Sequence, residues 1–165
     1  MASECLGIAL NARSLGPSQY TEWEFVSFCH FNGYCVGAGP NGTFILSGDT
    51  DDNASGEAQD IDAYVELATT DFGIQHQKRV RRAHVGYEAD GDVQLTLYNS
   101  EGNARAYTLS PTEDGQLQAG ARVSVGRGGK GRYWSAKIAN VDGSDFGLNH
   151  LTLDLVVLPR KPGGA

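Results

Sequence analysis

Alternating apolar and polar residues in Lys78–Leu109 constrain the fold of this chain more strongly than any other feature. A basic start leads into three alternating runs, Arg79–Tyr87, Val93–Tyr98 and Arg105–Leu109. The turn sequences EADGD and NSEGNA separate these runs. Because successive side chains of a strand point to opposite faces, such runs are typical of half-buried β-strands. We therefore predict an antiparallel meander here, which serves as the spine of a β-sheet.

Short runs separated by glycine-containing turns also fill the rest of the chain. The sequence has 22 glycines in 165 residues, and most stand where a turn is expected. Asn32-Gly33 is a strong hairpin signal because both residues tolerate positive φ. No helix is expected, although a helix over 61–69 is the alternative to a strand there. Further strands are predicted at residues 5–10, 23–31, 34–39, 43–48, 61–69, 121–126, 133–140 and 148–158.

The predicted fold is all-β, an antiparallel β-sandwich of jelly-roll-like type preceded by a small β-meander lobe. We assign residues 1–73 to the lobe, which carries an acidic loop, 74–160 to the sandwich and 161–165 to a flexible tail. A chain of this length buries roughly 70% of the surface that it exposes when unfolded, so it needs no covalent or metal cross-links to fold. Whether the lobe and the sandwich share one core is left open.

Charge and cysteine usage narrow the classes of partner and compartment. The net charge of −7 disfavours non-specific binding to nucleic acids or anionic membranes. No apolar run reaches 18 residues, so no membrane span is expected. The first 14 residues lack a basic leader followed by an apolar stretch, which favours use without Sec export. Cys5, Cys29 and Cys35 are then expected to be reduced, partly buried thiols, with a Cys29–Cys35 disulfide as the alternative.

An acidic loop at residues 49–60 is the first candidate for contacts with other subunits, through Asp49, Asp51 and Asp52. Its oxygen-bearing side chains at alternate positions resemble a calcium-binding loop. However, Ala54 stands where such loops have glycine, and no helices are expected on either side. The sequence therefore favours an acidic surface turn over a calcium site.

A basic glycine loop at residues 126–132 is the second candidate, through Arg127, Lys130 and Arg132. It resembles a phosphate-binding loop but lacks the serine or threonine after the lysine and a following helix. We expect a basic turn that pairs with acidic groups on the same chain or on a neighbouring subunit.

Arg79, Arg81 and Arg82, at the start of the meander, form the third candidate group. On a regular strand Arg82 shares a face with Lys78 and Val80, and Arg79 and Arg81 occupy the other face. Nucleic-acid binding is a minor alternative because no aromatic platform accompanies these arginines. We expect them to contact another lobe or subunit.

No arrangement of residues indicates a catalytic site, a metal site or a cofactor. The four histidines are isolated in the sequence, and no pair of carboxylates stands out from the 20 acidic residues. Aromatic side chains can stack on sugars, although packing is their commoner role. The aromatic candidates are Trp23, Tyr34, Tyr98 and Trp134. We therefore predict a protein that is not an enzyme.

A set of short motifs extends over residues 19–160. They are Tyr20–Phe28, Phe31–Tyr34, Gly37–Gly42, Ser47–Asp51, Thr70–Gly73, Lys78–Val80, Gly126–Trp134 and Asn140–Phe146. Together these motifs resemble a family of structural proteins of tailed-bacteriophage and prophage virions. The resemblance implies a component of the tail tip, baseplate or neck, present in several copies, and it implies no catalytic residues.

The resemblance further implies assembly into the virion after synthesis in the host cytoplasm. Other phage tail or neck proteins are the expected partners, and a homo-oligomeric ring is the expected assembly. Rings use different surfaces on the two sides of each subunit, and the loops at 49–60 and 126–132 are predicted to supply such a pair. The alternative is a carbohydrate- or receptor-binding β-sandwich module on the tail, with a host surface glycan as its ligand.

Overall fold

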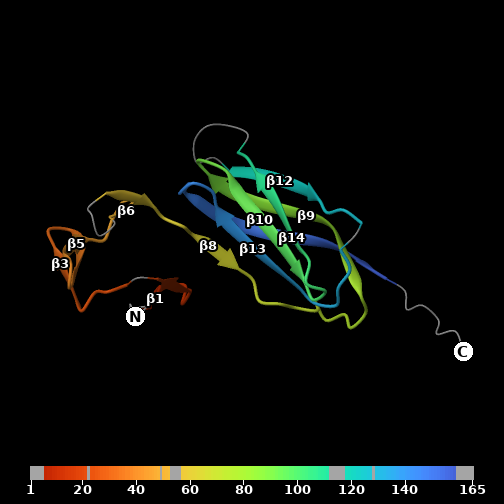
Figure 1. Ribbon diagram of the computed structural model, residues 1–165, viewed down its shortest axis with the longest axis horizontal. Helices are drawn as coiled ribbons and strands as arrows, with labels where there is room; N and C mark the ends of the chain where they lie inside the picture. Colours follow the sequence, from red (N-terminus) through yellow and green to blue (C-terminus); the bar gives the residue numbers. More distant parts are fainter. Residues whose placement is uncertain are drawn as a thin grey trace, which may run out of the picture. The chain divides into compact units, whose positions relative to one another are not determined.

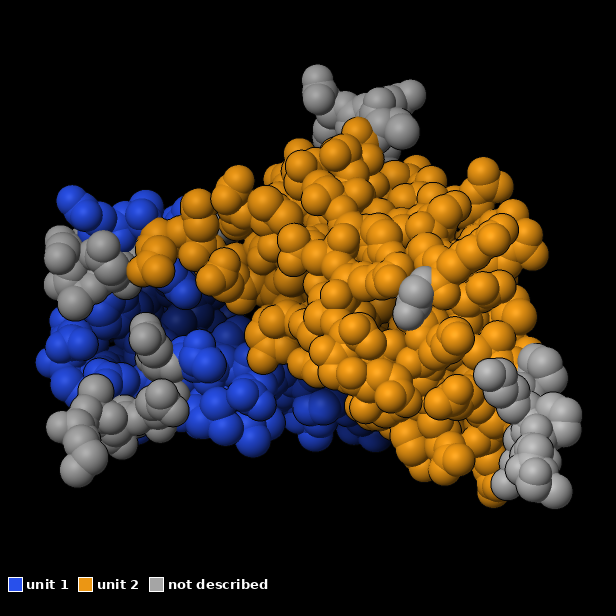
Figure 2. Space-filling model, turned by 45° about the vertical axis from the view of Figure 1, so that its right-hand side comes forward, with its two compact units in different colours: residues 1–58 blue, residues 59–165 orange. Residues whose placement is uncertain are grey.

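The computed structural model describes residues 6–21, 23–48, 50–52, 57–111, 118–127 and 129–158, without the side chain of Asp52 (Figure 1). The helices and strands of these segments are β-strands without exception, so the described residues contain no helix. This confirms the all-β prediction. The described residues include no helix long and apolar enough to cross a membrane. The chain divides into two compact units, residues 1–58 and 59–165, which we call unit 1 and unit 2 (Figure 2).

Unit 1 contains a two-stranded hairpin and a three-stranded meander. The predicted hairpin at Asn32 and Gly33 is confirmed, with φ angles of +49° and +88°. The strands are β1 (Gly7–Leu10) paired with β2 (Pro17–Tyr20), and β3 (Ser27–Phe31), β4 (Tyr34–Gly39) and β5 (Gly42–Ile45) paired in that order. Two further strands, β6 (Thr50–Asp52) and β7 (Ala58–Asp60), pair with each other.

Unit 2 is an antiparallel β-sandwich, as predicted. Sheet I contains β11 (Ala104–Leu109), β10 (Val93–Asn99), β13 (Trp134–Asn140) and β8 (Tyr64–Glu66), in that order. Sheet II contains β12 (Gln118–Ser124), β9 (Lys78–Ala89) and β14 (Phe146–Val157). The sandwich begins before the predicted boundary at residue 74, because β8 supplies an edge strand of sheet I.

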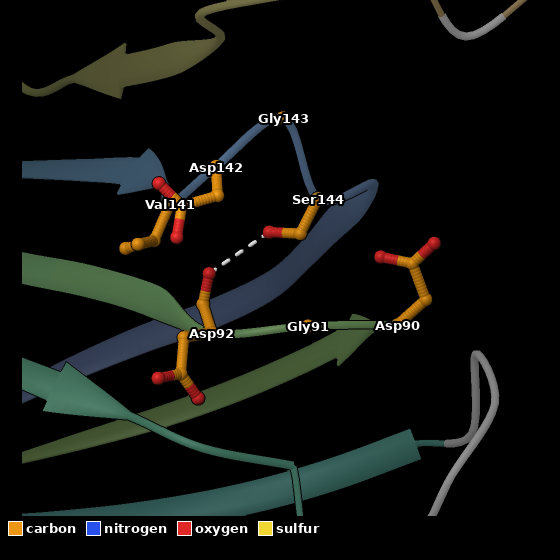
Figure 3. A pocket seen from close by; sticks show the side chains of 7 residues that line it. All are labelled: Asp90, Gly91, Asp92, Val141, Asp142, Gly143 and Ser144. Atoms are coloured by element: carbon orange, nitrogen blue, oxygen red, sulfur yellow. Dashed lines mark hydrogen bonds between the residues drawn. The ribbon is translucent and has the colours of Figure 1, made fainter. Parts of the chain in front are cut away.

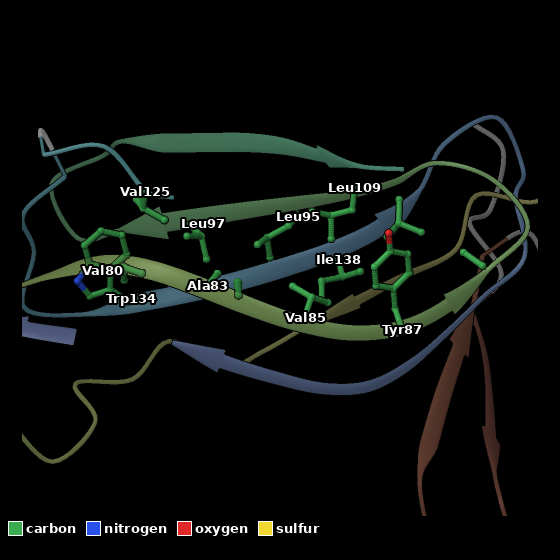
Figure 4. Packing of buried hydrophobic residues seen from close by; sticks show 13 residues of the cluster. Val80, Ala83, Val85, Tyr87, Leu95, Leu97, Leu109, Val125, Trp134 and Ile138 are labelled. Atoms are coloured by element: carbon green, nitrogen blue, oxygen red, sulfur yellow. The ribbon is translucent and has the colours of Figure 1, made fainter. Parts of the chain in front are cut away.

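The core of unit 2 lies between the two sheets (Figure 4). Val85 and Tyr87 from β9 face the interior together with Leu95 from β10 and Ile138 from β13, and each is almost completely buried. Trp134, only 2% exposed, packs at one end of the same cluster. Burial of each large apolar side chain contributes about 1.5–3 kcal/mol. This cluster is therefore the main source of stability in unit 2.

The predicted meander of Lys78–Leu109 is wrong in its pairing, although its three strands are present. β9 pairs with β12 and β14 in sheet II, whereas β10 pairs with β11 and β13 in sheet I. The turn at residues 90–92 thus carries the chain from one layer to the other. Alternation could not reveal this pairing. It shows only that one face of each strand is apolar, and that face can be buried whichever strands are its neighbours.

A β-bulge in β9 overturns the predicted sidedness of Arg82. A register shift between β9 and β14 leaves Arg81 without an opposite residue on β14. The extra residue inverts the alternation, so Val80 and Ala83 both face the core, as Lys78 does. Arg82 consequently lies on the outer face of sheet II, opposite to the face that holds Lys78 and Val80.

Candidate functional site

The basic loop at residues 126–132 lies at the end of the sandwich where β9 begins and β10 ends. The side-chain amide of Asn99 donates to the carbonyl of Lys130 at 3.1 Å. The backbone N–H of Arg132 donates to the hydroxyl of Ser100 at 3.3 Å. These bonds join the loop at Lys130 and Arg132 to the turn after β10 and fix the backbone at those two residues.

Two buried side chains support the same loop from beneath. The Lys78 ammonium, 0% exposed, donates to the carbonyl of Arg132 at 2.5 Å. The indole N–H of Trp134 donates to the carbonyl of Gly131 at 3.3 Å. Burial lowers the pKa of Lys78, and the negative charge of Asp71 raises it in part. The sequence placed Lys78 at a strand start without indicating that its amine supports the loop.

The structure brings two of the three predicted contact groups to one end of unit 2. The backbones of Lys78 and Gly131 pair as an isolated bridge, so the start of β9 adjoins the basic loop. We call this region the basic end. Its exposed or half-buried cations are Arg79, Arg81, Arg105, Arg127, Lys130 and Arg132. Arg82 is not among them, because the bulge places it on the outer face of sheet II.

The predicted acidic loop at 49–60 is only partly described. Asp49 lies outside the described residues, Asp51 is exposed, and only the backbone of Asp52 is described. Thr50–Asp52 and Ala58–Asp60 form paired strands, so the segment includes a ribbon where a turn was expected. Among the described residues, no group of three or more histidine, cysteine or acidic side chains could hold a metal ion.

A second acidic region, which the sequence analysis did not single out, lies at the other end of unit 2. The turns at 90–92 and 141–144 line a hollow of about 450 Å³ (Figure 3). The Ser144 hydroxyl donates to the carbonyl of Asp92 at 2.9 Å, and the backbone N–H of Asp145 donates to a carboxylate oxygen of Asp90 at 2.8 Å. We call this region the acidic end.

A third acidic segment reaches the acidic end through the edge strand β8. The side-chain amide of Asn140 donates to the carbonyl of Ile61 at 2.7 Å, and its oxygen accepts from the N–H of Ala63 at 2.9 Å. These bonds place Asp60 and Asp62 beside the end of β13. The turn sequences were visible in the chain, but only the strand order shows that three acidic segments meet.

The outer face of sheet II is polar and bears two histidines. The ring of His150 covers Gly86, where a β-carbon would lie 2.3 Å from the ring. The adjoining Gly120 has no atom within 4 Å of its β-carbon position, so the surface is open there. Further along the face, His84 contacts Asp154 at 3.4 Å. The surface is therefore open at Gly120, beside the imidazole ring that covers Gly86.

Amide and carboxylate groups border this glycine pair. The side-chain amide of Asn149 donates to Glu88 at 3.3 Å and also to the side-chain oxygen of Gln118. Isolated histidines in the sequence gave no sign of this arrangement, because His84 and His150 come from different strands. The pairing of β9 with β14 brings them to one face.

Unit 1 carries a cluster of aromatic rings in place of a buried core. Trp23 lies 4.7 Å from Tyr20 and 5.1 Å from Phe25, measured between ring centroids. Trp23 and Phe25 rest on glycines, since a β-carbon on Gly7 or Gly37 would meet their rings at 2.5 and 2.7 Å. The cluster thus depends on two positions without side chains.

The other aromatic candidates differ widely in exposure. Tyr34 and Tyr98 are exposed, whereas Trp134 belongs to the core of unit 2. Cys29 and Cys35 are free thiols, which agrees with the reduced state expected. Both are exposed, so the expectation of partial burial is wrong for them. Their strands pair Cys35 with His30, and Cys5 lies outside the described residues.

Four regions are therefore candidates for function: the basic end, the acidic end, the outer face of sheet II and the aromatic cluster of unit 1. No known protein-family model matches this chain, and no curated protein matches it significantly. The function of this protein is consequently inferred from the geometry of these regions and from the motifs of residues 19–160.

Proposed function

We propose that this protein is a non-catalytic structural component that assembles in several copies with other subunits in a tailed-phage virion. The tail tip, baseplate or neck would be its location, after synthesis in the host cytoplasm. The observation that carries the assembly role is the exposed apolar surface of unit 1. The motifs of residues 19–160, which resemble phage virion proteins, support the particular setting.

The large apolar side chains of unit 1 remain in contact with solvent. Ile8, Val26 and Phe31 are 73%, 82% and 72% exposed. All the buried hydrophobic residues of the described core lie between Val80 and Ile138, in unit 2. Covering apolar area releases roughly 25 cal/mol per Å², and extensive exposed apolar surface marks interaction sites. Unit 1 is therefore suited to contact another protein surface.

Location in the virion is tested directly on particles. Tailed particles would be purified on a density gradient from cells that produce this chain, and their proteins quantified by mass spectrometry. We expect the chain in the particle fraction at several copies per particle. Detection of the chain in cell lysate but never in particles would disprove the virion role.

The apolar surface is tested with the double variant Val26→Ser/Phe31→Ser. Because both side chains are exposed, the fold should tolerate the change, while incorporation into particles should fall at least about tenfold. Val157→Ser, at an exposed apolar position of unit 2, is the matched control. Normal incorporation of the double variant would show that this surface has no assembly role.

A carbohydrate-binding module is the second candidate, favoured by the outer face of sheet II. His150 offers a ring face beside the open position at Gly120, and the bordering Glu88, Asn149 and Gln118 offer hydrogen-bonding groups of the kind that sugars use. A glycan array with the full chain tests this function. His150→Ala should abolish any signal and His76→Ala, at an exposed turn position, should preserve it. Absence of any glycan signal would rule out this candidate.

A further inference from the structure

The acidic and basic ends of unit 2 are separated by the full length of its longest strands. β9 begins at the basic end with Lys78 and ends at the acidic end with Ala89. Its 12 residues span roughly 40 Å at about 3.3 Å per residue. Salt at physiological strength screens exposed charges beyond about 8 Å. The charges at the two ends therefore cannot neutralise each other within one molecule.

The division of charge between the ends is nearly complete. The segments 59–62, 88–92 and 140–145 contain seven acidic residues and no lysine or arginine. The acidic residues, all exposed, are Asp60, Asp62, Glu88, Asp90, Asp92, Asp142 and Asp145. The segments 70–81, 99–105 and 125–133 contain seven lysines and arginines against the two acids Asp71 and Glu101. Of these seven cations only Lys78 is buried.

We propose that unit 2 docks head to tail on a second copy of this chain. The basic loop at 126–132 of one copy then contacts the hollow at the acidic end of the next copy. Complementary potentials of this kind favour correct encounter and fix orientation. The two contacting surfaces differ, so the same contact can repeat from copy to copy into a ring or a filament. This inference rests on the proposed function, because it names a contact between copies of the chain that acts in addition to the apolar surface of unit 1.

Both surfaces are held in place before they meet. In the basic loop, bonds from Asn99, Ser100 and Lys78 fix the backbone at Lys130 and Arg132. The acidic hollow is fixed by the bonds that Ser144 and Asp145 make to the turn at 90–92. Little conformational freedom is therefore lost on docking, which lowers the entropic cost of the contact.

The acidic surface in this proposal differs from the loop at 49–60 that the sequence suggested. In unit 2 three acidic segments converge around the hollow at 90–92 and 141–144. The basic loop presents a compact group of cations at the opposite end of the same sandwich. Repetition of this one unit then suffices to bring complementary surfaces together.

Two charge-reversed variants of the full chain test the contact. Asp62→Lys/Asp92→Lys removes more than half of the negative charge of the acidic end and places two lysines there. Arg127→Glu/Lys130→Glu removes most of the positive charge of the basic end and places two glutamates in the loop. No side-chain hydrogen bond of these four residues is described in unit 2, so the fold should tolerate the changes, which circular dichroism would verify. The control Glu24→Lys/Asp51→Lys alters net charge by the same amount at exposed positions of unit 1.

Self-association would be measured by sedimentation velocity at about 50, 150 and 500 mM salt. We expect the wild type to associate more weakly as salt rises, and each reversed variant to associate at least about tenfold more weakly than the wild type. An equimolar mixture of the two variants should regain association to within about threefold of the wild type. The unaltered basic end of one variant then meets the unaltered acidic end of the other, and the introduced glutamates meet the introduced lysines. The control variant should behave as the wild type does.

Three results would overturn the proposal: a wild type that is monomeric at every concentration, a mixture that stays dissociated, or a control that weakens equally. Binding of nucleic acid by the basic end would also be salt-dependent, but it would not be restored by mixing the variants. Particle analysis separates this proposal from the proposed function. Variants that enter particles and associate normally would refute the docking alone, whereas end-dependent association of a chain absent from particles would refute the virion role alone.

Discussion

Units 1 and 2 are built from the same kind of sequence, yet they bury their apolar residues differently. Both consist of short antiparallel strands joined by turns that contain glycine. Unit 2 places two sheets face to face, and its apolar side chains fill the space between them. Unit 1 has one two-stranded and one three-stranded sheet, and its aromatic rings rest on glycines at positions 7 and 37.

This difference shows that alternation within a strand is not sufficient for a core. An alternating strand supplies one apolar face, and a second layer must cover that face. In unit 2 the crossing turns at 90–92 and 141–144 supply the second layer from the same chain. In unit 1 the described residues leave Ile8, Val26 and Phe31 largely exposed. We therefore expect stability to depend on buried residues in unit 2, and apolar contacts with other subunits to depend on exposed residues in unit 1.

The largest effect should come from Trp134→Ala, which tests whether the core of unit 2 carries the stability of the chain. The change removes the largest buried side chain and its hydrogen bond to Gly131, so the free energy of unfolding should fall by about 3–5 kcal/mol. Chemical denaturation followed by circular dichroism measures this loss. Tyr98→Ala, at an exposed position on sheet I, serves as control and should cost about 1 kcal/mol or less. Equal losses in the two variants would contradict the assignment of the core.

Most strands could be predicted from the sequence, because each depends on local alternation and on turn residues. The hairpin at Asn32-Gly33 and the strands around Val93 and Ile138 are examples. The assignment of strands to sheets could not be predicted. An apolar face can be covered by any second layer, so it does not identify the neighbouring strands. The extra residue at Arg81 inverts the alternation, and the residue types around it do not indicate a bulge.

The candidate sites were also predictable only where their residues are neighbours in the sequence. The basic loop at 126–132 is contiguous in the chain, so its charge is apparent from the sequence. The acidic end combines Asp62, Asp92 and Asp142 from three separate segments, and only the order of the strands brings them together. Burial of Lys78 was equally hidden, since a lysine at a strand start is usually exposed.

A smaller effect should come from Gly37→Ala, which tests whether the aromatic cluster of unit 1 needs a bare backbone beneath it. A β-carbon there would lie 2.7 Å from the Phe25 ring, so the ring must move, at a cost of about 1–3 kcal/mol to the local structure. Loss of amide protection in β4, followed by hydrogen exchange, measures the effect. Gly120→Ala is the matched control, because nothing lies within 4 Å of its β-carbon position. Unchanged protection in Gly37→Ala would show that the cluster adapts freely.

The smallest effect should appear as a pH dependence from Tyr87, which is fully buried in unit 2. Burial raises the pKa of its phenol above the ordinary value, and the charge of Asp92 adds to the shift. Below about pH 10 the phenol is neutral in both folded and unfolded chains and contributes no pH dependence. Above that pH the unfolded chain loses the proton first, so unfolding releases a proton and stability falls.

The variant Tyr87→Phe removes this dependence, so its advantage over the wild type should grow by up to about 1.4 kcal/mol per pH unit above about pH 10. The lowered pKa of Lys78 acts in the opposite direction near the same pH, and the comparison cancels it because both proteins retain that lysine. The difference at pH 7 supplies the baseline for the lost hydroxyl. A constant difference in the free energy of unfolding between the two proteins from pH 7 to pH 11 would contradict this expectation. It would mean that water reaches the phenol of Tyr87 at the acidic end of the core of unit 2.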